Sequence, residues 1–160
     1  MVSDSWDTFA GALQEESAAL RRVHQASLDL TNALIRNNAP EILVAERALD
    51  GARRAFVQAA GRRRGMQARG FGKLTLRQVC GYAPRRLMPT LNQRLYELTT
   101  LSINMRITTG NNKALIANGF KRLMRVTAAM QKASHDGPGT YRRRGFVPPP
   151  TNSVLVSSRA

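Results

Sequence analysis

The chain has 160 residues, 42% of them hydrophobic, which is the size and content of one folded domain with a tail. Its only cysteine is Cys80, so an internal disulfide is excluded and a disulfide-stapled secreted domain is not expected. The net charge of +15 is unevenly placed, because residues 1–50 carry a net −4 and residues 51–160 carry +19. This asymmetry favours an anionic partner, or an acidic first helix that lies against a basic last helix while the excess arginine is solvated.

The chain shows no sign of a membrane or secretory segment. No apolar run approaches the roughly 18 residues that a spanning helix requires. The start carries Asp4 and Asp7 instead of the basic residues and apolar stretch of a signal peptide. We therefore expect a cytoplasmic protein with no membrane insertion.

The first predicted helix covers about residues 5–36. Its apolar residues recur at steps of three and four, which is the spacing of one helix face: Trp6, Phe9, Leu13, Leu20, Val23, Leu30 and Leu34. Glu16 and Ser27 interrupt this stripe, so we place them near an exposed edge. Asp4 or Ser5 is expected to cap the start. Asn37 and Asn38 end the helix, since Asn tolerates the left-handed conformation.

A second helix is predicted over about residues 40–60. Pro40 suits its first turn, where the missing N–H has no helical partner to lose. The apolar stripe contains small residues that permit close helix packing: Ile42, Ala45, Leu49, Ala52, Phe56 and Ala59. The turn between the two helices is so short that they form an antiparallel hairpin.

Residues 61–73 contain four glycines and five basic residues without periodicity, which predicts a flexible, positively charged loop. Thr75 is expected to cap a short helix over about 75–80, which Gly81 closes. Pro84 and Pro89 disfavour regular helix before about Met88.

The last predicted helix, about residues 88–134, carries a long coiled-coil seam. Its members recur at steps of four and three: Leu91, Leu95, Leu98, Ser102, Met105, Thr109, Asn112, Ile116, Gly119, Leu123, Val126 and Met130. Residues 108–112 are poor helix formers and a kink there is expected. Asn112 has two interpretations that both stay open: a polar residue that fixes the register of the seam, or a capped, solvent-facing residue at the kink.

The predicted fold is therefore all-α: an elongated antiparallel helical hairpin or coiled coil of three main helices. The helical domain covers residues 1–136. Residues 137–160 form a basic tail rich in proline and glycine, which we expect to be disordered.

Catalytic and cofactor motifs are not found in the sequence. His24 and His135 are far apart and lack ligand partners at metal-binding spacing, and Cys80 is expected to be a buried thiol. Gly65 and Gly70 have the spacing of a phosphate loop, but Phe71 stands where its lysine belongs. We expect no cofactor, no metal and no enzymatic activity.

Two arginine triplets are candidate basic patches, Arg62, Arg63 and Arg64 in the first and Arg142, Arg143 and Arg144 in the second. Each triplet is able to contact phosphates in a salt-dependent way, and Tyr141 and Phe146 flank the second as stacking groups. A basic coiled-coil protein that binds nucleic acid is therefore an alternative. Solvated loops that keep a helical protein soluble explain the same residues.

Four short segments resemble the FlgN-like flagellar export chaperones. Residues 33–41 (ALIRNNAPE) look like the first interhelical turn of that family, and residues 74–79 (LTLRQV) like its short third segment. Residues 111–116 (NNKALI) are similar to its last helix, and residues 141–145 (YRRRG) to its tail. The resemblance implies a cytoplasmic helical protein that binds hook-associated (hook–filament junction) subunits and delivers them to the membrane export gate. Tyr141 and Phe146 would then be the docking point for the gate.

The lengths of the predicted helices indicate where a client would bind. A first helix of about 45 Å cannot cover a last helix of about 60 Å or more. The apolar residues toward the end of the last helix then lack an internal partner: Ile116, Phe120, Leu123, Met124, Val126, Thr127 and Met130. Such a stripe suits an amphipathic helix of the client. A self-associating structural coiled coil fills the same stripe, so monomer and homodimer both remain open.

Overall fold

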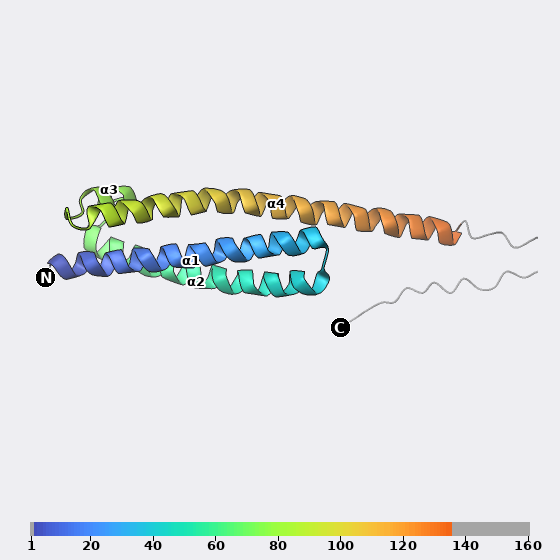
Figure 1. Cartoon of the computed structure of the whole chain (residues 1–160), viewed down its shortest axis with the longest axis horizontal. Helices are drawn as coiled ribbons and strands as arrows, with labels where there is room; N and C mark the ends of the chain where they lie inside the picture. The colour runs from blue at the N-terminus through green and yellow to red at the C-terminus, as the bar shows by residue number, and fades with distance from the viewer. Residues whose placement is uncertain (1, 136–160) are drawn as a thin grey trace, which may run out of the picture. The chain divides into compact units, whose positions relative to one another are not determined.

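The computed structural model describes residues 2–135, with side chains from Ser5 to Lys132. It contains four helices in that range: α1 (Val2–Arg36), α2 (Ala39–Phe71), α3 (Leu76–Gly81) and α4 (Met88–His135) (Figure 1). No strand occurs among the described residues, so the predicted all-α class is confirmed. The predicted tail with Tyr141, Phe146, Arg142, Arg143 and Arg144 lies outside the described residues.

The chain forms two compact units, residues 1–120 and 121–160, and α4 contributes residues to both. In the first unit α1 and α2 are antiparallel neighbours, and α3 lies beside the start of α4 (Figure 1). Within this unit α4 runs parallel to α1, because Ser17 contacts Glu97 and Thr31 contacts Asn112 at almost the same sequence separation. The described part of the second unit, residues 121–135, is helical.

The turn between α1 and α2 has the predicted chemistry. Asn37 is left-handed, with φ of 53°, and it follows the last residue of α1. Asn38 is the N-cap of α2, and its side chain accepts a hydrogen bond from the backbone N–H of Glu41. Pro40 stands in the first turn. These local contacts reverse the chain within two residues and make the hairpin.

An aromatic cluster closes one end of the first unit. The ring of Phe71 lies 4.5 Å from that of Trp6 and 5.2 Å from that of Phe9, measured between centroids. The buried residues around them come from α1, from α3 and its following turn, and from the start of α4: Leu13, Val79, Cys80, Ala83 and Leu91. A second cluster between α1 and α2 uses alanines with Val23, Leu30 and Leu49.

The predicted loop at residues 61–73 is wrong, as is the predicted end of the second helix at residue 60. Helix α2 continues to Phe71 and ends at Gly72, whose φ of 64° suits glycine. Met66 and Phe71 pack on the aromatic cluster, and Arg63 is paired with Glu16. These tertiary contacts outweigh the low helix propensity of the glycines.

The cap of α3 and the start of α4 agree with the prediction. Thr75 caps α3, and its side chain and that of Gln78 form a reciprocal capping box. After the turn with Pro84, α4 begins at Met88. The poor helix formers of residues 108–112 lie inside α4, which is one continuous helix.

The predicted seam of α4 is right at every seventh position from Leu91 to Asn112 and partly wrong between those positions. Leu91 and Asn112 are buried, and Leu98 and Met105 are partly buried. Ser102 and Ile116 are exposed, and the neighbouring residues Leu101, Thr108 and Leu115 are the ones turned inward. The predicted stripe and the observed stripe both contain Leu98, Met105 and Asn112. The spacing of apolar residues alone therefore does not decide which of the two stripes packs inward.

Candidate protein-binding surface

Glu97 joins α4 to α1 through polar contacts. Its carboxylate accepts a hydrogen bond of 2.7 Å from Ser17 Oγ. It also pairs with Arg21 at 3.0 Å and with Arg94 at 3.1 Å. The hydrogen bond from Ser17, helped by the two guanidinium groups, lowers the pKa of Glu97 below its usual value. The carboxylate is therefore held in its charged form at the contact between the helices.

Asn112 makes a second polar contact between α4 and α1. Its Nδ2 donates to the Ser27 carbonyl at 3.1 Å, and the Thr31 hydroxyl lies 2.7 Å from its Oδ1. Asn112 and Ser27 are both buried. The solvent-facing interpretation of Asn112 is therefore wrong, and so is the exposed edge predicted for Ser27. Asn112 and Ser27 hydrogen-bond to each other inside the bundle. That Asn112 fixes the register of α4 against its neighbour stays a prediction.

The first arginine triplet lies within α2, where its members have different surroundings. Arg63 donates to both carboxylate oxygens of Glu16, at 2.6 and 3.0 Å, and both side chains are largely buried. Arg62 pairs with Glu15 at 3.0 Å on the surface. Arg64 bonds the carbonyl of Ala60. The exposed edge predicted for Glu16 is thus wrong, and the guanidinium of Arg63 is already paired with the Glu16 carboxylate.

Sequence reasoning did not find the Glu16–Arg63 pair, although both residues occupy stripe positions. Glu16 stands in the apolar stripe of α1, and Arg63 follows Phe56 by seven residues on α2. Extending the stripe of the second helix past residue 60 places an arginine where an apolar residue is expected. A buried acid on the neighbouring helix is the partner that such an arginine requires.

The predicted client-binding residues are exposed. In the first unit, Ile116 and Phe120 are 54% and 62% exposed. In the second unit, four apolar side chains are between 52% and 67% exposed: Leu123, Met124, Val126 and Met130. Thr127 is also exposed, and its hydroxyl bonds the Leu123 carbonyl within the helix. Within the described residues, the members of the predicted set in each unit are thus exposed.

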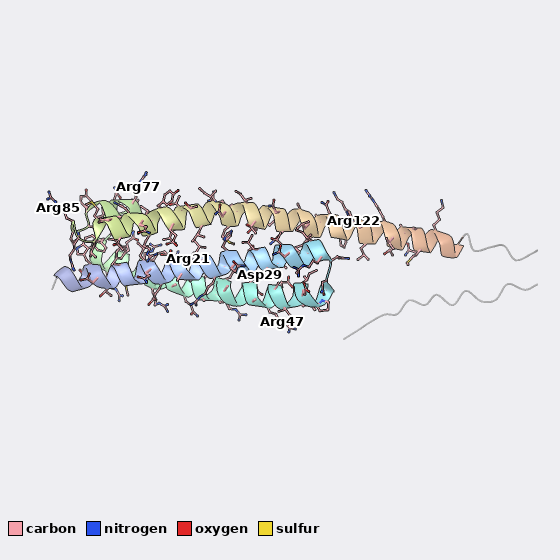
Figure 2. All side chains as sticks on the ribbon, in the orientation of Figure 1. Arg21, Asp29, Arg47, Arg77, Arg85 and Arg122 are labelled. Carbon is pink, nitrogen blue, oxygen red and sulfur yellow. The ribbon has the colours of Figure 1, made fainter. Side chains whose placement is uncertain are left out.

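The helix of residues 121–135 has two chemically different faces. At 100° per residue, Leu123, Val126, Thr127 and Met130 fall on one side. By the same spacing Lys121, Arg125 and Lys132 fall on the opposite side, and Arg122, which is labelled in Figure 2, falls between the two. This stretch contains no Asp or Glu. It is a basic amphipathic helix whose apolar side is uncovered among the described residues.

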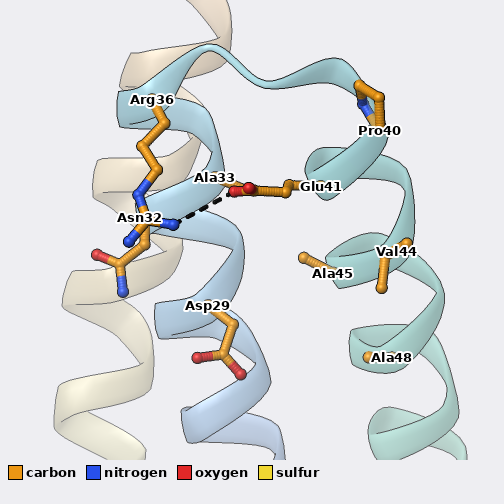
Figure 3. A pocket seen from close by; sticks show the side chains of 9 residues that line it. All are labelled: Asp29, Asn32, Ala33, Arg36, Pro40, Glu41, Val44, Ala45 and Ala48. Atoms are coloured by element: carbon orange, nitrogen blue, oxygen red, sulfur yellow. Dashed lines mark hydrogen bonds and ion pairs between the residues drawn. The ribbon is translucent and has the colours of Figure 1, made fainter.

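A groove of about 490 Å³ lies beside the turn of the α1–α2 hairpin (Figure 3). Small residues such as Ala33, Ala45 and Ala48 form its sides, together with Val44. Arg36 and Glu41 form an ion pair of 3.4 Å across it. Its lining holds no cysteine, serine or histidine, and its polar groups do not converge on one point. We assign it no role.

Cys80 is a free, buried thiol, as predicted. Burial raises its pKa, which disfavours the reactive thiolate. Within residues 2–135, no three His, Cys, Asp or Glu side chains are arranged to hold a metal ion.

None of the helices in the described range has a stretch that is both long and apolar enough to cross a bilayer. No model of a known protein family, no curated protein and no solved structure matches this chain.

Proposed function

We propose that this protein is a non-enzymatic, cytoplasmic export chaperone of the FlgN-like kind. It binds hook-associated subunits before their export and carries them to the membrane export gate. The observation that supports this proposal is the uncovered apolar side of α4, where Leu123, Val126 and Met130 are each more than half exposed. Exposed apolar stripes of this kind are typical of protein-binding surfaces.

The proposed mechanism is the masking of a client helix. An amphipathic helix from the end of a subunit places its own apolar residues against Leu123, Val126 and Met130, so that neither surface faces water. Met124 and Met130 have flexible, unbranched side chains that adapt to different partner surfaces. A chaperone with more than one client benefits from such adaptable contacts.

The first unit acts in this proposal as the support for α4. Hydrogen bonds of Glu97 and Asn112 attach α4 to α1. Near the start of α4, Leu91 packs in the aromatic cluster. These contacts stop before Ile116, which is exposed. The part of α4 that packs on α1 and the proposed binding part therefore occupy successive segments of one helix.

The experiment is a calorimetric titration of the full chain with purified hook-associated subunits. Leu123→Glu places a carboxylate on the apolar side and is expected to weaken binding at least tenfold. Asn118→Glu is the matched control, because it adds the same charge at an exposed position on the polar side of α4. Equal binding by the wild-type chain and Leu123→Glu contradicts the proposal, as does the absence of binding by the wild-type chain.

A further inference from the structure

We propose that an anionic membrane surface binds the apolar side of residues 121–135 and thereby displaces the client. This inference concerns the regulation of the client-binding surface and rests on the proposed function. It is carried by the combination of exposed apolar side chains and unopposed positive charge on one helical segment.

The apolar side matches the interface of a lipid bilayer. Leu123, Val126 and Met130 are more than half exposed and recur at helical spacing. A helix with such a side lies in the plane of the membrane, with its apolar residues at the boundary between headgroups and acyl chains. At 1.5 Å per residue the segment 121–135 is about 22 Å long, enough to lay four turns on the surface.

The charge of the segment selects anionic lipid. Lys121, Arg122, Arg125 and Lys132 contribute four positive charges, and no carboxylate within residues 121–135 offsets them. None of the four has an ion pair among the described residues. Long basic side chains on the polar side extend to the headgroups while the apolar residues enter the bilayer. Each cation near an anionic surface strengthens binding by roughly fivefold.

Nucleic acid fits this segment less well than a membrane does. Duplex binding uses positive charge but gains nothing from Leu123, Val126 and Met130, which stay exposed. Residues 121–135 contain no Phe, Tyr or Trp side chain on which a base stacks. A membrane uses both sides of the helix at once, so its binding depends on the apolar residues as well as on the charge.

Competition follows from the shared surface. The client helix and the bilayer both cover Leu123, Val126 and Met130, so one excludes the other. A client captured in solution is then released when the chaperone reaches a membrane rich in anionic lipid. Release of this kind needs no further factor.

The first experiment is co-sedimentation of the full chain, without client, with vesicles of phosphatidylcholine and phosphatidylglycerol at a ratio of 3:1. Vesicles of phosphatidylcholine alone are the lipid control. We expect at least tenfold stronger binding to the anionic vesicles. Leu123→Gln with Met130→Gln removes the apolar side without changing the charge and is expected to weaken binding to the anionic vesicles at least tenfold. Circular dichroism checks that the variant remains helical.

Two pairs of arginine variants distinguish the contribution of residues 121–135 to vesicle binding from that of the protein's overall charge. Arg122→Gln with Arg125→Gln is expected to weaken vesicle binding roughly 25-fold, at about fivefold for each cation. Arg77→Gln with Arg85→Gln removes the same charge from exposed positions near α3 and is expected to change binding less than twofold (Figure 2). Equal effects of the two arginine pairs overturn the inference and assign the attraction to the general charge of the protein. Full binding by Leu123→Gln with Met130→Gln also overturns it, because the apolar side is then not used.

The second experiment adds the same vesicles to the preformed client complex. Release of the client by anionic vesicles, and its retention with phosphatidylcholine vesicles, supports the inference. A client that stays bound on the vesicle surface overturns it while leaving the proposed function intact. A chain that binds vesicles but never binds a client contradicts the proposed function instead.

Discussion

Arg63 of α2 donates two hydrogen bonds to the carboxylate of Glu16 on α1, at 2.6 and 3.0 Å, with both side chains largely buried. Gln67 also accepts from the Arg63 guanidinium at 2.7 Å. The pair lies between the aromatic cluster and the alanine-lined contact of α1 with α2. It connects the acidic first helix to the basic part of the chain, residues 51–160.

Removing one partner of this pair is expected to destabilise the fold. Arg63→Ala leaves the Glu16 carboxylate buried without its counter-charge, which costs about 3–5 kcal/mol of unfolding free energy. Urea unfolding followed by circular dichroism measures it. Arg62→Ala removes a guanidinium from a surface pair and is expected to cost about 1 kcal/mol or less. Equal losses in the two variants contradict the buried role of Arg63.

Asn112→Ala is expected to lower the unfolding free energy by about 1–3 kcal/mol, because the buried polar groups of Ser27 and Thr31 lose a partner. Asn111→Ala is the matched control, since Asn111 is the exposed neighbour on the same helix. Its effect is expected to stay within about 0.5 kcal/mol. The two variants are compared by thermal unfolding, and equal midpoints argue against the buried contact.

Stability is expected to fall in acid through Glu97. Its pKa is lower in the folded chain than in the unfolded chain, so the unfolded state binds the proton more tightly. The contribution of Glu97 to the unfolding free energy is complete above the pKa that its carboxyl has in the unfolded chain. It is lost as the pH falls through the pKa that the carboxyl has in the folded chain. Glu97→Gln therefore loses less stability than the wild type between pH 7 and pH 3 in urea titrations. Glu46→Gln, at an exposed position of α2, supplies the control. Parallel losses for wild type and Glu97→Gln rule out this linkage.

Cys80 is expected to resist thiol reagents in the folded protein. Its side chain is fully buried and burial raises its pKa, so both access and the thiolate fraction are low at pH 8. Reaction with a chromogenic disulfide is expected to be at least a hundredfold slower in buffer than in denaturing urea. Fast labelling of the native chain is incompatible with this burial.

Much of the fold was predictable because local rules decide it. The Asn37–Asn38 turn, the Thr75 cap and the start of α4 near Met88 follow from residues that act on their immediate neighbours. The length of α2 was not predictable from composition, because Arg63 is held in helix by an acid 47 positions away. Which residues of α4 face α1 was not predictable either, because Asn112 is held by Ser27 and Thr31 of that other helix.

The candidate binding surface was predictable from the mismatch in helix length. The mismatch predicts that Leu123, Val126 and Met130 lack an internal partner, and they are exposed. Ile116 is exposed as well, although its spacing also places it in the seam that packs on α1. The identity of the partner does not follow from these residues, because an apolar stripe specifies a complementary surface and not a particular protein.

Hydrogen exchange of the full chain, with and without a hook-associated subunit, tests the central claim most directly. The account predicts slower amide exchange in residues 121–135 on binding, because a covered helix opens less often than an exposed one. It predicts little change in α1 and α2, whose contacts are already made within the first unit. Protection confined to the α1–α2 hairpin, with residues 121–135 exchanging as in the free chain, contradicts it.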